Sequence, residues 1–493
     1  MENVTAMTRT ALIVAACVLY GGHIISAQGQ KLKEVKIQGY VTDVKSPTVF
    51  EIEDYRITRD QGFVLDFENA SPDISFKAED IRVGVELEIK GSLNESTGEL
   101  KAKSIKIDLE QFRPAKQTAI IATPIQGLQK SGNGWSGRFA ADGQAIVITP
   151  TTQVLFKPTN REKKLIKQQK QASGVDADGG DEGFEPLTSL DQVDIGMALT
   201  YEGTRSQDGT EILASRLEFS RNDLENGEAR LWKSLKASVK GAESLSGGEL
   251  KISQVGKFKL LPDPTVQEYV ASIGRKLVPP YQSRLSATDP SRIPFQFYVV
   301  KDDEANAFAL PSGIVVVNSG LIEFLDNEAQ FAEVIGHEMA HATHEHTWRQ
   351  QNYKKKTRIG IALAGAVANA YGMRSLGDIA NMVNAALVSG YSRTLENQAD
   401  RVGLEYMTAA GYDPREAPAV WKLMTKKYGL EATNFFYSSH DNHAVRRSYL
   451  MNELKNNYRG IDFSALHTNT DEFARIKAAV VAAKNPKRRL KVS

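Results

Sequence analysis

The sequence predicts an α+β domain in the C-terminal half, preceded by two small all-β repeat domains. Three observations lead to this prediction. The chain has 493 residues, and at about 150 residues per domain this length suits three domains. Residues 31–221 contain short alternating runs separated by turn residues, whereas a long run around residue 337 has helical spacing. A composition of 41% apolar and 25% charged residues is typical of globular proteins and argues against wholesale disorder or several membrane spans.

Residues 1–27 have the features of an export signal. Arg9 precedes an apolar run at residues 11–20, and the small residues Ser26 and Ala27 follow it. We therefore expect an exported, periplasmic protein. In a second interpretation residues 14–17 form a lipobox, so that Cys17 is lipidated and anchors a lipoprotein; a third is a buried helix. Cys17 is the single cysteine of the chain, so no disulfide forms within the mature fold.

Residues 31–112 and 117–221 are predicted to form β domain 1 and β domain 2. Both alternate polar and apolar residues in short runs, and a turn rich in Ser, Gly, Asn or Asp joins two such runs in each. Small barrels of the OB type would suit this length and pattern. Similar residue types recur at identical offsets of 7, 18 and 21 residues, which indicates a repeat. The first copy is Gly84, Gly91, Ala102 and Ile105, and the second is Gly196, Gly203, Ala214 and Leu217.

The charge pattern gives no case for nucleic acid as a partner. The formal net charge is +1, and neither β domain has a basic stripe with interleaved aromatic residues. A charged insertion at residues 158–186 of β domain 2 is expected to be a solvated loop. No catalytic constellation precedes residue 230, so the β domains should recruit, position or restrain rather than react.

A histidine cluster carries the chemistry. The chain has eight histidines, and four lie between residues 337 and 346. His337, Glu338 and His341 form an HExxH motif inside a run with helical spacing. Histidines one helical turn apart share a face and can hold zinc at about 2.0–2.1 Å, with the glutamate beside them as a general base. The alternative is a surface helix that carries histidines by chance.

A catalytic zinc needs a third protein ligand. The metzincin pattern is absent, because His344 and Thr347 occupy its glycine and third histidine positions. Glu396 is the best candidate, and Asp400 lies one helical turn later, where it could orient a liganding histidine. Without the HExxH motif this segment would read as an ordinary exposed helix face.

With these residues in view, residues 261–483 resemble the HtpX-like and CAAX-prenyl-protease-like zinc metallopeptidases, especially their soluble exported branch. The resemblance implies a zincin-type (gluzincin-like) catalytic domain at residues 225–485. It also implies one zinc ion per chain, held by His337, His341 and Glu396, with Glu338 as catalytic base. The matching blocks are residues 306–311 with Gly313, Gly320 and Leu321, then residues 337–341, then residues 392–400, and finally Ser439 and His440 with Arg446.

The resemblance further implies that His440 and Arg446 act near the metal; here Asp441 follows His440, where the family commonly has proline. Residues 306–318 read as one strand. As an edge strand it could align an extended substrate, with Asn306, Ala307, Phe308 and Ala309 as binding residues, although a plain core strand is equally consistent.

A basic run and an apolar run follow the histidine cluster at residues 354–370. We expect a lid over the cleft, with peripheral membrane contact as the alternative. Residues 486–493 form a basic tail.

The resulting functional hypothesis is a zinc metalloendopeptidase that cleaves unfolded or misassembled polypeptides in the cell envelope, in protein quality control. One rival is a zinc-containing chaperone or assembly factor with a latched or weak protease site. The other is a binding protein in which the β domains have the main function.

Overall fold

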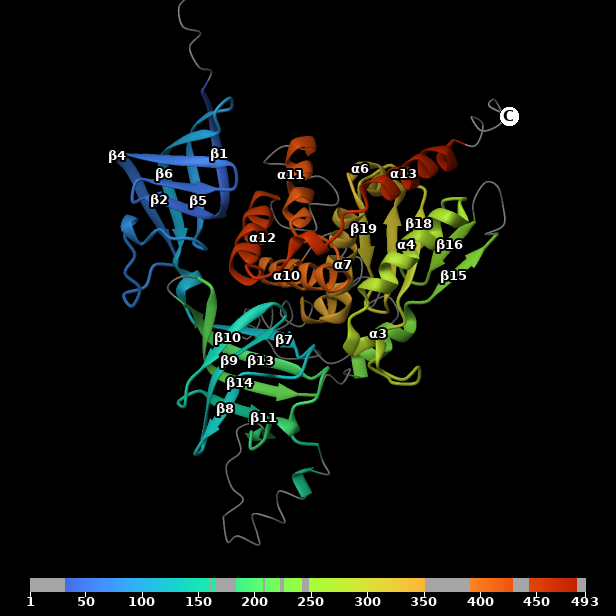
Figure 1. The fold of residues 1–493 in the computed structure, drawn as a ribbon, viewed down its shortest axis with the longest axis horizontal. Helices are drawn as coiled ribbons and strands as arrows, with labels where there is room; N and C mark the ends of the chain where they lie inside the picture. Colours follow the sequence, from blue (N-terminus) through green and yellow to red (C-terminus); the bar gives the residue numbers. More distant parts are fainter. Residues whose placement is uncertain are drawn as a thin grey trace, which may run out of the picture.

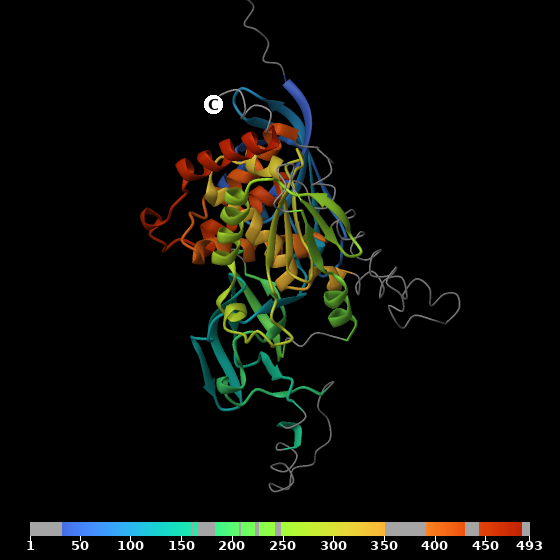
Figure 2. The ribbon, with the colours of Figure 1, turned by 90° about the vertical axis from the view of Figure 1, so that its right-hand side faces the viewer.

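A computed structural model describes residues 32–159, 162–164, 183–206, 209–221, 226–241, 248–350, 391–428 and 443–485. The chain forms β domain 1, β domain 2 and a C-terminal domain of helices and two small sheets (Figure 1). β domain 2 lies below the C-terminal domain in both perpendicular views (Figures 1 and 2). The two β domains have separate hydrophobic cores, and two further clusters fill the C-terminal domain.

β domain 1 is a six-stranded sheet with the strand order β1-β5-β6-β4-β3-β2. Strands β4 and β6 are parallel, and the other neighbours are antiparallel. Because β1 and β2 are consecutive in the chain, one stretch of sequence supplies both edges of the sheet. The strands are β1 (Leu32–Tyr40), β2 (Asp43–Ser46), β3 (Val49–Ile52), β4 (Tyr55–Glu68), β5 (Glu86–Asn94) and β6 (Glu99–Asp108).

β domain 2 follows the same plan. β7 pairs with β13, β13 pairs with β14, and β14 runs parallel to both β10 and β11. β9 and β8 complete the sheet beyond β10. The strands are β7 (Ala115–Ile120), β8 (Leu128–Ser131), β9 (Gly134–Ala141), β10 (Gln144–Ile148), β11 (Gln153–Phe156), β12 (Glu185–Pro186), β13 (Ala198–Arg205) and β14 (Glu211–Ser220). β12 pairs with β11, so the end of the expected insertion is part of the sheet.

The repeated glycines occupy equivalent places in the two sheets. Gly91 opposes Ala102 at a bulge between β5 and β6, and Gly203 opposes Ala214 at a bulge between β13 and β14. A Cβ atom on Gly91 would lie 2.2 Å from a carbonyl oxygen of the neighbouring strand, and one on Gly203 would lie 2.5 Å from the equivalent oxygen. The close approach of the two backbones therefore requires glycine at both positions.

The C-terminal domain contains two three-stranded sheets, β15-β16-β17 and β18-β20-β19. Their strands are β15 (Ala237–Lys240), β16 (Glu249–Ile252), β17 (Gly256–Lys259), β18 (Gln296–Val300), β19 (Ala307–Ala309) and β20 (Ile314–Asn318). The helices that surround them are α3 (Asn226–Ser234), α4 (Pro264–Leu277), α5 (Pro280–Ser283), α6 (Ser319–Phe324), α7 (Glu328–Thr343), α10 (Arg393–Ala409), α11 (Glu416–Tyr428), α12 (His443–Asn457) and α13 (Thr470–Lys484).

The prediction of one strand over residues 306–318 was wrong. This segment forms two antiparallel strands, β19 and β20, joined by a turn in which Gly313 has φ +84°. β20 is buried throughout and lies between β18 and β19, so it is a core strand. β19 is at the edge of the sheet.

Both β domains contact the helices of the C-terminal domain. In β domain 1 the Tyr40 backbone N–H donates to Ser448 Oγ of α12 at 2.8 Å. The Arg447 guanidinium, also on α12, donates to the Glu53 carboxylate at 2.8 Å. Figure 1 shows β1 beside α12, in agreement with these contacts. Helix α12, which follows the histidine motif in the chain, is therefore held in place by contacts with β domain 1.

Some predictions concern residues outside the described ranges. These are the export signal with Cys17, the lid or membrane contact at residues 354–370, His440, most of the insertion at residues 158–186, and the basic tail at residues 486–493. Within the described ranges, none of the helices has the length and apolar character needed to cross a bilayer.

Candidate metal centre

The histidine motif lies on α7, a helix buried along its whole length. Asn327 caps its start, since its side-chain oxygen accepts from the Gln330 backbone N–H at 2.9 Å. His337 and His341 are one turn apart on the same face, and each exposes at most 3% of its surface. The local sequence therefore dictates that the two imidazoles point into one buried volume.

Glu396 reaches this volume from the first turn of α10, because α7 and α10 pack unusually close together. A Cβ atom on Gly403 of α10 would lie 2.8 Å from the His337 backbone nitrogen, and one on Gly336 would lie 3.1 Å from the Gly403 carbonyl oxygen. Glycine on both helices therefore permits backbone contact. This contact places the fully buried Glu396 carboxylate opposite the histidines.

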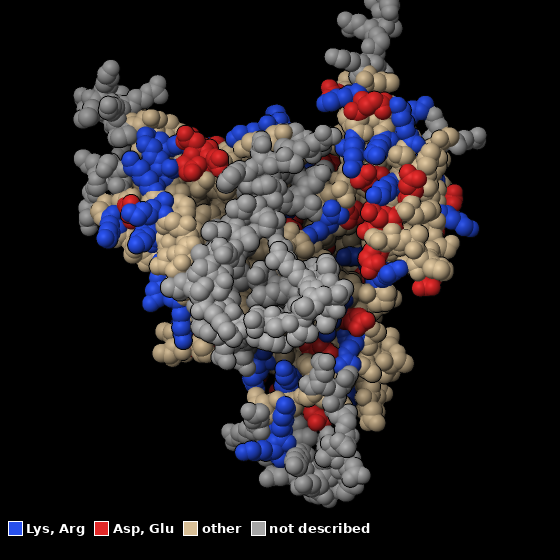
Figure 3. Space-filling model, turned by 180° about the vertical axis from the view of Figure 1, so that it is seen from behind, with Lys and Arg blue, Asp and Glu red and all other residues tan. Residues whose placement is uncertain are grey.

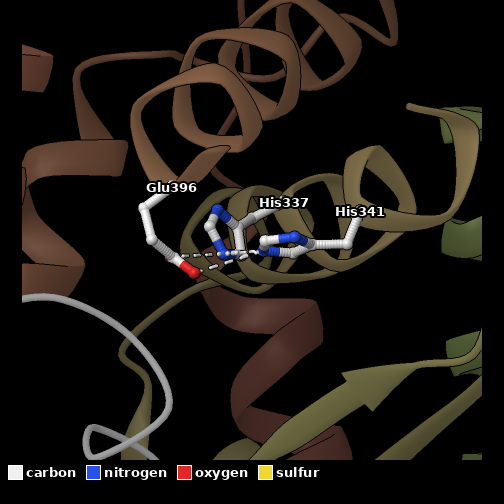
Figure 4. A group of neighbouring side chains, drawn as sticks. All are labelled: His337, His341 and Glu396. Carbon is white, nitrogen blue, oxygen red and sulfur yellow. Dashed lines mark hydrogen bonds and ion pairs between the residues drawn. The ribbon is translucent and has the colours of Figure 1, made fainter. Parts of the chain in front are cut away.

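The three side chains converge on one point (Figure 4). The Nε2 atoms of His337 and His341 are 3.0 Å apart. Glu396 Oε2 is 3.5 Å from His337 Nε2, and Oε1 is 3.7 Å from His341 Nε2. A tetrahedral zinc ion with bonds of about 2.0–2.1 Å would separate its ligand atoms by about 3.3–3.4 Å. The observed separations bracket this value, so the donor set and its spacing fit a zinc ion.

The second nitrogen of His337 faces charged groups. His337 Nδ1 is 3.1 Å from Asp400 Oδ1, and Arg446 Nε donates to Asp400 Oδ2 at 2.9 Å. Burial opposes ionisation of Asp400, but Arg446 and His337 outweigh it and lower the pKa of this carboxyl below its ordinary value. Arg446 Nη2 also lies 2.8 Å from His337 Nδ1. An ionised Asp400 beside this nitrogen favours the tautomer of His337 with Nδ1 protonated, whose unprotonated Nε2 can bind a metal. The Arg446 guanidinium also stacks on the Trp421 ring at 3.7 Å.

The second nitrogen of His341 faces a different environment. His341 Nδ1 is 2.9 Å from His346 Nδ1, and His346 Nε2 is 3.2 Å from Gln398 Oε1. Burial, together with the nearby His344 and Arg349, lowers the pKa of His346 well below its ordinary value, so this imidazole is neutral. The two candidate metal ligands thus face unlike partners, a carboxylate for His337 and an imidazole for His341.

Glu338 lies beside the ligands and contacts the edge strand. Its Oε2 atom accepts from the Ala309 backbone N–H at 3.1 Å. Glu338 exposes 3% of its surface. The general base expected from the motif is thereby tied to β19, the strand expected to align a substrate.

The structure brings most of the predicted site residues together. His337, His341 and Glu396 form a group of ligand atoms that all lie within 4.8 Å of one another. Asp400, Arg446, Glu338 and Ala309 contact this group or its neighbours. Asn306, Ala307 and Phe308 lie at and before β19, and His440 lies outside the described residues.

Four residues at or near the centre were missed from the sequence. Tyr391 stacks on the His341 ring with centroids 4.0 Å apart. His346 and Gln398 bond to one another behind His341, and Asp142 of β domain 2 accepts from Gln398 Nε2 at 2.8 Å. His346 and Gln398 were detectable as polar residues within a few positions of the motif residues. Asp142 had no local signal, because it is far away in sequence.

Comparison with known proteins agrees with this geometry. Residues 264–454 match the model of Peptidase family M48. This range includes α7, α10 and most of α12, and both β domains lie outside it. The family resemblance inferred from the sequence is confirmed for this part of the chain.

Curated relatives match over stretches of similar length. The β-barrel assembly-enhancing protease of Escherichia coli (strain K12) is 32% identical over 185 residues, which cover 36% of this chain and 36% of that protein. The mitochondrial metalloendopeptidase OMA1 of Arabidopsis thaliana is 34% identical over 160 residues, which cover 32% of this chain and 31% of that protein. This chain therefore spans about a third of the length of these relatives.

Proposed function

Starting from a peptidase family M48 domain at residues 264–454, we propose that this protein is a zinc-dependent endopeptidase of the cell envelope that cleaves unfolded or misassembled proteins. The observation that carries the proposal is the convergence of His337, His341 and Glu396, with Glu338 beside them. Similarity to a protease whose name refers to β-barrel assembly supports a role in envelope protein quality control. The export signal expected at residues 1–27 supports the same location.

The chain's own residues suit peptide hydrolysis. When bound, a zinc ion supplies a Lewis acid that lowers the pKa of water and polarises a carbonyl group. Glu338 takes a proton from the attacking water and returns a proton to the leaving amine as the C–N bond breaks. The Ala309 N–H holds the Glu338 carboxylate in place for both transfers.

The edge position of β19 supports recognition of an extended polypeptide. β19 pairs with β20 along one side, and its last residue, Ala309, contacts Glu338. A substrate strand that adds to the other side would be held through its backbone, so selection by side chain would be loose. Loose selection suits a protease for unfolded chains, and we propose Asn306, Ala307, Phe308 and Ala309 as the substrate-binding residues.

We also propose that both β domains are OB-type barrels that position or restrain the peptidase domain. The support is a strand order in which one stretch of chain supplies both edges, with a parallel pair in the middle. A nucleic acid partner is not proposed. On the described part of the face in Figure 3, acidic and basic side chains are interspersed, and the net charge is +1.

Burial of the site favours a second candidate function. His337, Glu338, His341 and Glu396 each expose at most 3% of their surface. A chaperone or assembly factor that keeps its zinc site latched would have such a buried site.

One experiment separates the two functions. The purified mature chain and Glu338→Gln are loaded with zinc and incubated with unfolded casein, and fragments are followed by mass spectrometry. Cleavage by the parent alone is expected, since the substitution removes the base and leaves the ligands. Cleavage by neither chain, with zinc bound to both, would refute the endopeptidase and favour the chaperone.

A further inference from the structure

A continuous line of hydrogen bonds runs from β domain 2 to the zinc ligand His341. Gln398 Nε2 donates to Thr118 O of β7 at 2.6 Å and to Asp142 Oδ2 at 2.8 Å. Gln398 Oε1 is 3.2 Å from His346 Nε2, and His346 Nδ1 is 2.9 Å from His341 Nδ1. Every side chain in this line is at least nine-tenths buried.

The chemistry of the first groups sets the direction of the whole line. A carbonyl oxygen and a carboxylate can only accept hydrogen bonds, so Thr118 and Asp142 require the amide NH2 of Gln398 to face them. Its carbonyl oxygen must then face His346. The hydrogen-bonding partners of the Gln398 amide therefore determine its orientation.

The direction continues through the two imidazoles. Because Gln398 Oε1 can only accept, His346 carries its proton on Nε2 and presents a bare Nδ1 to His341. His341 must therefore carry its own proton on Nδ1. Its Nε2 is then unprotonated, and this atom is the one that faces His337 and Glu396. A reversed Gln398 amide would favour the opposite tautomer of His341, which cannot bind a metal through Nε2.

The turn that contains Asp142 keeps its carboxylate in position to accept the hydrogen bond from Gln398. Asp142 and Gly143 join β9 to β10 with φ values of +49° and +70°, as a tight two-residue hairpin turn requires. Asp142 Oδ1 accepts from the Ile120 backbone N–H at 3.1 Å. The Asp142 backbone carbonyl accepts from Arg401 Nε of α10 at 2.6 Å. Asp142 is 4% exposed, so water does not compete for its carboxylate.

We propose that β domain 2 sets the tautomer of the zinc ligand His341, with Asp142, Gln398 and His346 as positioning residues. This inference rests on the zinc site of the proposed function and assigns β domain 2 a part in it. Docking of β domain 2 on α10 makes the centre competent for zinc, and undocking weakens zinc binding. Metal affinity therefore reports on an interface between two domains.

The test measures zinc affinity of the full chain by competition with a chromogenic chelator, without substrate. Gln398→Met keeps the length of the side chain but has neither the acceptor nor the donor, and is expected to lower zinc affinity by about 10- to 100-fold.

The matched control is Arg447→Gln. Arg447 of α12 donates to the Glu53 carboxylate of β domain 1 at 2.8 Å, so the control removes a contact between a β domain and the C-terminal domain that is not part of the line. It should bind zinc like the parent. The proposal fails if folded Gln398→Met binds zinc within about twofold of the parent, or if the control loses as much affinity as Gln398→Met.

A second measurement needs no variant that might misfold. In the zinc-loaded parent labelled with ¹⁵N-histidine, two-bond correlation spectra distinguish the two tautomers of each imidazole. His346 protonated on Nε2 supports the proposal, and His346 protonated on Nδ1 overturns it. A parent that binds zinc but does not cleave casein refutes only the proposed function, whereas unchanged zinc affinity of Gln398→Met in an active protease refutes only this inference.

Discussion

Glu333 gives a quantitative prediction about stability and pH. It lies on α7 one turn before His337, is 2% exposed, and within the described part of the chain neither of its carboxylate oxygens has a hydrogen-bond partner. Burial, reinforced by the Asp400 charge, raises the pKa of Glu333 to about 8, against an ordinary value of 4.5. The folded chain therefore keeps this proton at pH values where the unfolded chain has released it.

The direction and size of the pH-dependent change in the free energy of unfolding follow from this difference in pKa. Proton release favours the unfolded state, so the contribution of Glu333 to stability is greatest below pH 4.5 and is lost as the pH rises to about 8. One pH unit within this window costs about 1.4 kcal/mol. In Glu333→Gln the side chain at position 333 does not titrate. Between pH 5.5 and 7.5 its free energy of unfolding should therefore rise, relative to the parent, by about 2 to 3 kcal/mol.

The assay is urea unfolding of both metal-free chains at pH 5.5 and 7.5, followed by tryptophan fluorescence. Three of the four tryptophans, Trp232, Trp348 and Trp421, lie in the C-terminal domain, so the signal reports mainly on the domain that contains Glu333. The titratable groups that do not interact with Glu333 are shared by both chains and cancel in the comparison. A difference between the chains that does not change with pH would refute the reasoning.

Three further predictions concern the metal, the repeat and a helix cap. Glu396→Gln should lower zinc affinity at least tenfold while the chain stays folded, because an amide is a weaker zinc ligand than a carboxylate. Competition with a chelator measures this affinity, and normal zinc retention would mean that another residue is the third ligand. Gly91→Ala should destabilise β domain 1 by about 2 kcal/mol in thermal unfolding, because the added Cβ would lie 2.2 Å from a backbone oxygen. At Gly62 an added Cβ would meet no described atom within 4 Å, so Gly62→Ala should have the melting temperature of the parent. Asp263→Ala should cost about 1 kcal/mol in thermal unfolding, since its carboxylate caps the start of α4; an unchanged melting temperature would contradict this.

The parts of the site that follow from local spacing could be predicted from the sequence. His337 and His341 are separated by one turn of a helix that their neighbours also favour, so the common face of the two histidines needs no tertiary information, and Glu338 follows His337 directly in the sequence. The role of Glu396 was inferred from a charged and apolar pattern supported by the family resemblance. Its actual placement depends on the backbone contact between Gly336 and Gly403, which no periodicity reveals.

The remaining features depend on the tertiary structure. Asp142 meets His344 across 202 residues of sequence, and its neighbours in the chain are typical of any hairpin turn. The two strands β19 and β20 were mistaken for one because their apolar residues form a nearly continuous run. Pro311 and Gly313 lie between them, and these turn-forming residues were a signal that could have divided the run.

The most direct test of the zinc endopeptidase is a metal titration of activity. The chain is stripped of metal, and cleavage of unfolded casein is measured while zinc is added in steps. The account predicts no cleavage at the start, followed by a rate that rises in proportion to zinc and levels off at one equivalent per chain. Cleavage by the metal-free chain, or no cleavage after zinc has saturated the protein, would contradict the account.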